Sequence, residues 1–231
     1  MLKREMKRAS DERIPLKNLG QAPTHFVRFA TPTLCDARPA TCEPRDLDAT
    51  EDLPEFHVEE DDWRQIEFLP TSLRDDLQDE IAAIEKFKVE RWEGEGWADI
   101  YLRRDHLEGL PSIQLPFEEL SKLFKSWRRH DLPLIRESSD VTTIAKVDGS
   151  FLFEASEEAF FYGQEHVGTV TVVAMRFFGQ GRGSYSKLIE KLVELGGAFP
   201  LLMVDWNSGL IVDLRKREEI ERWVDPIEDA A

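Results

Sequence analysis

A glycine-rich segment is the part of this chain whose residue types and position most suggest chemistry. Gly179-Gln180-Gly181-Arg182-Gly183 lies between a predicted strand and a predicted helix, where free backbone N–H groups at a helix start can bind a phosphate. The segment has neither a Gly-Lys-Ser/Thr ending nor the spacing of a dinucleotide fingerprint. A flexible connection is therefore the favoured interpretation, and a nucleotide- or phosphate-binding loop is the alternative.

The histidines and paired carboxylates show no catalytic or metal-binding spacing. Asp105 and His106 are neighbours, but adjacent residues on a strand point to opposite faces. The acidic run that ends at Asp62 lacks the Asp-x-Asp-x-Asp-Gly spacing of a calcium loop. We predict no catalytic residue, no cofactor and no metal ion, and we expect surface or loop positions for the five histidines: His25, His57, His106, His130 and His166.

Acidic residues beside tryptophans form a more informative pattern. Trp63 directly follows four acids, and Trp92 and Trp97 enclose the segment Glu93-Gly94-Glu95-Gly96. Protein interfaces use aromatic anchors for affinity and surrounding charges for rate and selectivity. Because tryptophan is mostly buried in proteins, each of these residues taken singly is better interpreted as part of the core.

The negative charge is concentrated in one part of the sequence. Residues 43–108 contain 22 acids and 8 bases, whereas residues 1–42 contain 4 acids and 8 bases, and the whole chain carries -16. A concentrated field speeds encounter with a partner of opposite sign and rejects other partners. The same balance argues against nucleic-acid binding, which needs a basic stripe.

Length and composition indicate a soluble globular protein. The chain has 231 residues, of which 41% are hydrophobic, and its longest apolar stretches are far shorter than a membrane span. The basic N-terminus has no apolar segment behind it, so we expect no secretory signal. Two cysteines, Cys35 and Cys42, fit a reducing cytoplasm, although a disulfide between them stays possible at this spacing.

Hydrophobic periodicity predicts the regular elements. The clearest helix begins near Ser72, a candidate N-cap, and has an apolar stripe formed by Leu73, Leu77, Ile81, Ile84 and Phe87. Its acids fall largely off that stripe. Further helices are predicted at 116–127, at 185–195 with Gly196-Gly197 as its end, and at 216–224 with Pro226 as its end.

Strand patterns fill most of the remaining sequence. Candidate strands are 25–30, 62–69, 98–103, 141–147, 151–155, 159–162 and 166–178. Residues 199–206 and 210–214 predict a hairpin with Ser208-Gly209 in its turn. The fold class is therefore α+β, with a largely antiparallel sheet and helices packed on it. We expect a basic flexible arm at 1–24, an acidic subdomain at 25–108 and a strand-rich subdomain at 109–231, or one continuous domain.

Two stretches resemble bacterial immunity proteins of polymorphic toxin systems, which include contact-dependent and type VI secreted nucleases. They are Glu60-Asp61-Asp62-Trp63-Arg64-Gln65-Ile66-Glu67-Phe68 and Val204-Asp205-Trp206-Asn207-Ser208-Gly209-Leu210-Ile211-Val212-Asp213. The resemblance implies a cytoplasmic, non-enzymatic inhibitor that binds one cognate toxin. A nuclease toxin is basic around its cleft, so an acidic inhibitor can occupy or block that cleft.

On this interpretation the acids provide the contact surface. We predict one patch at the run before Trp63 and a second patch on the exposed face of the first long helix. The predicted partner-binding residues are Glu59, Glu60, Asp61, Asp62, Trp63, Asp75, Asp76, Asp79 and Glu80. A small enzyme that uses Gly179–Gly183, and a regulatory scaffold with several partners, are the alternative functions. The oligomeric state is not predicted.

Overall fold

The computed structural model of the protein describes residues 29–35, 42–45, 57–59, 62–104, 106, 109–130, 134–136, 144–147, 149–156, 159–178 and 185–230. These residues form an α+β arrangement with a large antiparallel sheet, as the strand and helix patterns predict. None of the helices in these ranges is long and apolar enough to cross a membrane.

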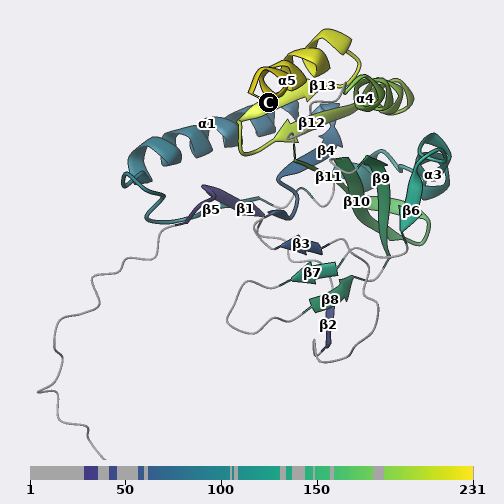
Figure 1. Ribbon diagram of the computed structural model, residues 1–231, viewed down its shortest axis with the longest axis horizontal. Coiled ribbons are helices and arrows are strands. Elements are labelled where there is room, and N and C mark those ends of the chain that lie inside the picture. Colours follow the sequence, from purple (N-terminus) through teal and green to yellow (C-terminus); the bar gives the residue numbers. More distant parts are fainter. Residues whose placement is uncertain are drawn as a thin grey trace, which may run out of the picture.

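A seven-stranded sheet forms the centre of the fold (Figure 1). Every neighbouring pair in it is antiparallel. In spatial order its strands are β13 (Leu210–Asp213), β12 (Leu201–Asp205), β4 (Ile66–Pro70), β11 (Thr169–Phe177), β10 (Ala159–His166), β9 (Ser150–Ser156) and β6 (Arg128–His130). Strand β4 lies between β11 and β12, so the sheet contains strands from both of the predicted subdomains.

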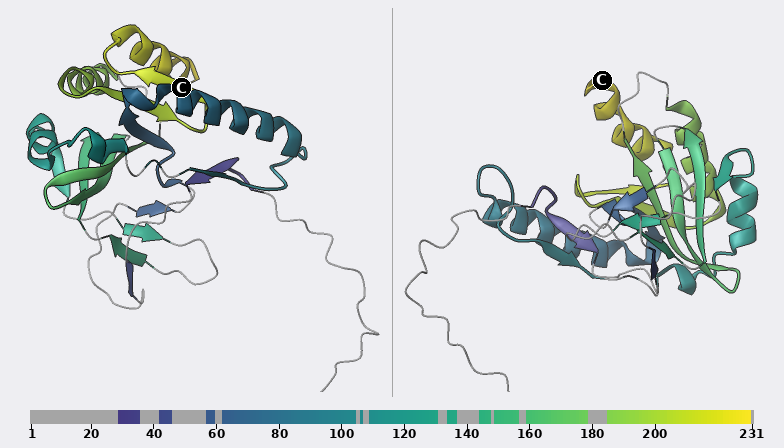
Figure 2. Two further views of the ribbon diagram at one scale, coloured as in Figure 1. Left: turned by 180° about the vertical axis from the view of Figure 1, so that it is seen from behind. Right: turned by 60° about the horizontal axis from the view of Figure 1, so that its bottom comes forward.

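Two smaller sheets lie beside the large one. Strands β1 (Thr33–Cys35) and β5 (Tyr101–Arg103) form a parallel pair. The other small sheet has the order β2 (Cys42–Arg45), β8 (Ile144–Val147), β7 (Leu134–Arg136) and β3 (His57–Glu59). In Figure 2 the β1–β5 pair runs alongside the long helix α1 (Arg74–Arg91), which projects past the large sheet.

Helices cover both faces of the large sheet. On one face Leu77 and Ile84 of α1 pack with Leu202, Val204 and Trp206. The short helix η3 (Thr71–Leu73) leads into α1. The opposite face is covered by α2 (Gly109–Ser112), α3 (Phe117–Leu123), α4 (Ser186–Ala198) and α5 (Arg217–Ala230).

Strand β12 shows why its sequence is a continuous apolar run. Leu201 and Met203 belong to the core under α4 and α5, and Leu202 and Val204 belong to the core under α1. Because successive side chains alternate between the faces, a strand covered on both sides needs apolar residues at every position. The predicted hairpin is confirmed, and Gly209 in its turn has a φ of 69°, which glycine adopts without strain.

Four predicted helix boundaries are wrong, and one of them is the end predicted at residue 127, because α3 ends at Leu123. The N-cap of α1 is Leu73 and has no side-chain cap, so Ser72 does not cap this helix. Helix α4 continues through Gly196 and Gly197 to Ala198, and Gly196 packs directly against Leu214. Helix α5 continues past Pro226 to Ala230, although proline cannot donate the helical hydrogen bond at its position.

Candidate functional site

The outer face of α1 carries a group of three exposed aspartates. Leu77 and Ile84 hold the helix against the sheet, which leaves Asp75, Asp76 and Asp79 exposed on the other side. Within the described part of the chain none of these three carboxylates forms an ion pair with a basic side chain. Their position in the first two turns also suits the positive end of the helix dipole.

Glu80 does not belong to this exposed face. Its side chain is buried, with 5% of the residue accessible. One oxygen, Oε1, accepts a hydrogen bond from the Arg104 N–H at 2.7 Å, and Oε2 lies 2.9 Å from His106 Nε2. The prediction that Glu80 contributes to the exposed face is therefore wrong, because α1 turns this carboxylate toward the segment after β5.

The Glu80–His106 contact changes the protonation of both groups. Its hydrogen bond raises the pKa of His106 above the usual 6.5, against the effect of burial. Burial opposes the ionisation of Glu80, but the bonds from His106 and the Arg104 N–H hold its pKa below the usual 4.5. His106 thus lies in a loop, as predicted, but it forms an internal ion pair with Glu80, whereas His166 is exposed as predicted.

The end of α1 brings acids and an exposed tryptophan together. Trp92 is 49% accessible and meets Trp97 edge-on, with ring centres 4.9 Å apart. The turn between them is closed by a hydrogen bond from Glu93 N to Gly96 O at 2.9 Å, and Gly94 adopts a φ of 86°. Trp97 Nε1 donates to the Lys88 carbonyl, so the turn is tied back to the helix.

Exposed side chains surround Trp92. Val89 lies one helical turn before it and is 82% accessible. Glu90, Glu93 and Glu95, which are near Trp92 in the sequence, are also exposed. An exposed aromatic ring with an aliphatic neighbour and a rim of carboxylates has the composition of an interface anchor.

The acidic run before Trp63 has a different environment. Trp63 is only 4% accessible and packs on Tyr162, with ring centres 5.4 Å apart, so it is a core residue. Asp62 forms an ion pair with Arg176 at 2.6 Å. Glu59 ends β3, and its side chain and the residues Glu60 and Asp61 lie outside what the structure describes.

A buried polar network fixes the segment after Trp63. Arg64 Nε donates to Glu67 Oε2 at 2.7 Å, and Trp206 Nε1 donates to Glu67 Oε1 at 2.8 Å. Arg103 Nη1 donates to Gln65 Oε1 at 2.9 Å, and its guanidinium lies 5.0 Å from the centre of the Trp206 ring. These contacts join three distant segments, and no local sequence signal predicts them.

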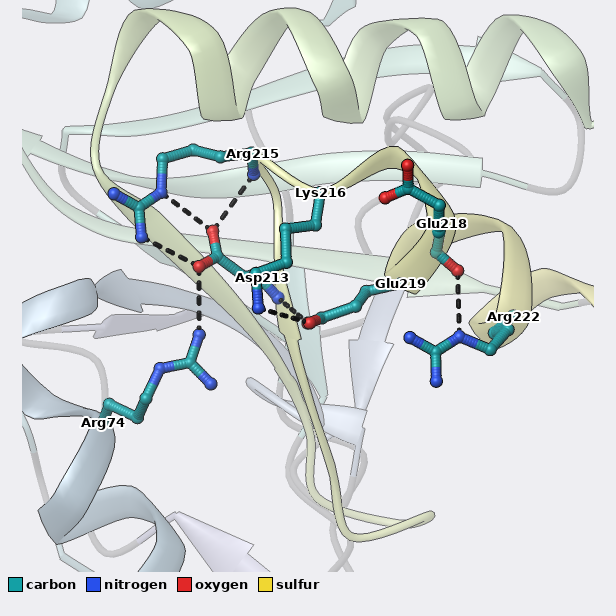
Figure 3. A network of polar contacts seen from close by, with 7 residues as sticks. All are labelled: Arg74, Asp213, Arg215, Lys216, Glu218, Glu219 and Arg222. Carbon is teal, nitrogen blue, oxygen red and sulfur yellow. Dashed lines mark hydrogen bonds and ion pairs between the residues drawn. The ribbon is translucent and has the colours of Figure 1, made fainter.

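A second polar network connects the start of α1 to β13 (Figure 3). Asp213 accepts hydrogen bonds from Arg215 Nε at 3.0 Å and Nη2 at 2.8 Å, and from Arg74 Nη2 at 3.2 Å. The bonds from Arg215 lower the pKa of Asp213 to about 2, although burial acts against this shift. The network holds the start of α1 against the end of β13, and it also orients the Arg74 side chain.

Other predicted features lie partly outside the described residues. These include Gly179–Gly183, the 1–24 arm, and the side chain of Cys42, on which the disulfide with Cys35 depends. In the described part of the chain no group of three or more His, Cys, Asp or Glu residues is arranged to hold a metal ion.

The acidic face of α1, defined by Asp75, Asp76 and Asp79, and the Trp92 turn, residues 89–97, together form the candidate interaction surface. Both come from one helix and the turn that follows it, so they share a rigid support. The chain matches no protein-family model, no curated protein and no solved structure with which it was compared.

Proposed function

We propose that this protein is an immunity protein, which binds a basic cognate toxin in the cytoplasm and neutralises it. The toxin is a secreted bacterial protein, and we infer that it is a nuclease. The observation that carries the proposal is the exposed Trp92 near carboxylates at one end of a helix that carries three exposed aspartates at the other. An 18-residue helix is about 27 Å long, so the surface can span a nucleic-acid-binding cleft.

Each part of this surface has its own role in the proposal. Asp75, Asp76 and Asp79 attract a basic cleft from a distance and replace phosphate groups within it. Trp92 and Val89 provide apolar contact once the partner has docked. Long-range attraction between exposed charges is screened by salt, so association should slow as ionic strength rises.

The test combines capture of the partner with a functional assay. The tagged protein is used to capture a binding protein from its own host, and that protein is then purified and assayed for nucleic-acid cleavage. We expect a basic nuclease that is inhibited at an equimolar ratio. A captured protein without toxic activity, or cleavage that continues with excess inhibitor, contradicts the proposal.

Matched variants identify the surface. One variant carries Asp75→Asn, Asp76→Asn and Asp79→Asn, and its control carries Glu118→Gln, Glu119→Gln and Glu194→Gln, which remove the same charge from exposed positions on α3 and α4. The α1 variant should lose association rate, and Trp92→Ala should raise the dissociation rate, with a cost of about 2 kcal/mol or more. Equal binding by the α1 variant and the control would place the interface elsewhere.

A further inference from the structure

A small pocket lies on the open edge of the large sheet, away from the Trp92 turn. It has a volume of about 340 Å³ and lies where the start of α1 and the helix α5 flank strand β13. Leu210, Ile211, Val212 and Trp223 form its apolar walls. Leu210 is 45% accessible, and Trp223 is fixed by a bond from its Nε1 to Asp205 Oδ2 at 3.1 Å. The volume is at the lower end of the range for ligand pockets.

One residue of strand β13 has backbone N–H and carbonyl groups that point toward the open edge and make no hydrogen bond in the described structure. It pairs with β12 on one side and ends the sheet on the other. Asp213 faces the open side, where its N–H donates to Glu219 Oε2 and its carbonyl accepts from Lys216 N. Because the facing alternates along a strand, Ile211 also points its N–H and carbonyl outward. In the described structure no hydrogen bond is made by these two groups of Ile211.

Two arginines give the pocket a charge opposite to that of the chain. Arg74 uses Nη2 to bind Asp213, and Arg222 uses Nε to bind the Glu218 carbonyl at 3.1 Å. Among the described residues their remaining guanidinium N–H groups have no protein acceptor. In Figure 3 the Arg222 side chain extends toward Arg74, with Glu219 between them. Planar guanidinium groups suit a carboxylate, which each can bind through two parallel bonds.

Glu219 also lines the pocket, but both of its oxygens are already engaged. Oε1 accepts from Lys216 Nζ at 2.8 Å, and Oε2 accepts from Asp213 N at 2.8 Å. Its charge is therefore compensated locally by Lys216. The two arginines remain the groups able to bind an incoming anion.

We propose that this pocket binds the C-terminal carboxylate of a peptide whose last side chain is apolar. The carboxylate pairs with the guanidinium of Arg222, the last peptide unit bonds to the backbone of Ile211, and the apolar side chain packs on Leu210 and Trp223. A chain end fits better than a long strand, because β13 has only one residue with free outward groups. This proposal is independent of the proposed function, since it uses a different surface.

The test uses N-acetyl-Ala-Val-Leu as a free acid and its C-terminal amide as the matched ligand. Binding to the full chain is followed by two-dimensional NMR of backbone and indole N–H groups. We expect a saturable response of Ile211 N–H and Trp223 Nε1–H with a Kd on the order of 1 mM. The amide should bind at least about tenfold more weakly, because it lacks the charge that the guanidinium groups recognise.

Two variants distinguish binding in the pocket from general attraction of the peptide to positive surface charge. Arg222→Gln should weaken binding of the acid about tenfold, whereas Arg91→Gln, which removes an exposed arginine at the far end of α1, should leave it unchanged. Thermal unfolding checks that both variants are folded. Equal affinities for acid and amide, an unaffected Arg222→Gln variant, or a response to inorganic phosphate but not to the peptide acid would each overturn the proposal.

Discussion

Gly196 packs so closely against Leu214 that a side chain at this position has no space. A Cβ added to Gly196 would lie 2.4 Å from the backbone carbon of Leu214, whereas a Cβ on Gly197 would meet nothing within 4 Å. The two glycines are neighbours in α4, so they share a helical context and differ in their surroundings. Gly196 therefore sets the distance between α4 and the segment that follows β13.

This difference predicts opposite effects on stability. Gly196→Ala should lower the free energy of unfolding by about 1–3 kcal/mol, because α4 must move away from Leu214. Gly197→Ala should raise it by about 0.5–1 kcal/mol, because alanine loses less backbone entropy than glycine in a helix. Urea denaturation of both variants is the measurement, and destabilisation of equal size in both would show that the close contact is not the cause.

The buried pair Arg64–Glu67 should be far more sensitive to substitution than an exposed pair. Both of its side chains are 3% accessible, and Glu67 also accepts the indole N–H of Trp206. Glu67→Gln removes the negative charge that this buried guanidinium pairs with at 2.7 Å, so we expect a loss of about 3–5 kcal/mol in unfolding free energy.

Glu90→Gln is the control for this substitution. Glu90 pairs with Lys86 at 3.8 Å on the exposed surface of α1, so its loss should change stability by less than about 0.5 kcal/mol. Both values come from chemical denaturation in the same buffer. A similar small loss for Glu67→Gln would mean that the network around Trp206 relaxes to satisfy Arg64.

The Glu80–His106 pair predicts a pH dependence of stability. The pKa of His106 is raised in the folded protein. The contribution of His106 to the free energy of unfolding is therefore complete below the usual pKa of 6.5, and it is lost as the pH rises through the folded-state pKa. The lowered pKa of Glu80 acts in a separate, more acidic range, where its contribution is lost as the pH falls.

The comparison uses two histidine variants over about pH 6 to 9. The stability difference between the original chain and His106→Gln should shrink as the pH rises, whereas His166→Gln, at an exposed position, should show no such trend. Unfolding free energies at several pH values give this directly. A constant difference for His106→Gln would mean that the contact stabilises without a change in protonation.

The pKa of the Asp213 carboxyl group is about 2, and the hydrogen bonds from Arg215 are the main cause of this low pKa. Arg215→Gln should raise this pKa toward 3.8, and Arg74→Gln should raise it less, because the bond to Arg74 is the longest in the network. The contribution of Asp213 to stability is complete above 3.8 and is lost as the pH falls through its folded-state pKa. NMR titration of the carboxyl carbon measures these pKa values. A larger effect of Arg74→Gln would mean that Arg74, and not Arg215, is the main cause of the lowered pKa.

Local patterns predict those elements whose residues interact with their near neighbours. The β12–β13 hairpin follows from two apolar runs joined by Ser208-Gly209, and the antiparallel pairing of the two strands confirms it. The existence of α1 follows from the spacing of Leu77 and Ile84, which the structure buries. The α+β class follows from these elements together.

Long-range contacts explain the failures. Glu80 is buried because His106 and Arg104, more than 20 residues later, supply its hydrogen bonds, and helical periodicity does not report such partners. Trp63 packs on Tyr162 and is buried, which agrees with its interpretation as a core residue and not with its place in a contact patch. Trp92 is 49% accessible, so its interpretation as a core residue is wrong. Its exposure depends on how the following turn folds back to Lys88.

The position of β4 in the centre of the sheet has a consequence for biosynthesis. Its partners β11 and β12 come much later, and residues 71–200 separate β4 from β12. At ribosomal speeds of about 5–20 residues per second, β4 leaves the exit tunnel on the order of ten seconds before β12. During that time an apolar strand has both edges open, which is a state that chaperones recognise and that aggregates readily. The large sheet therefore cannot be completed before the last quarter of the chain has been translated.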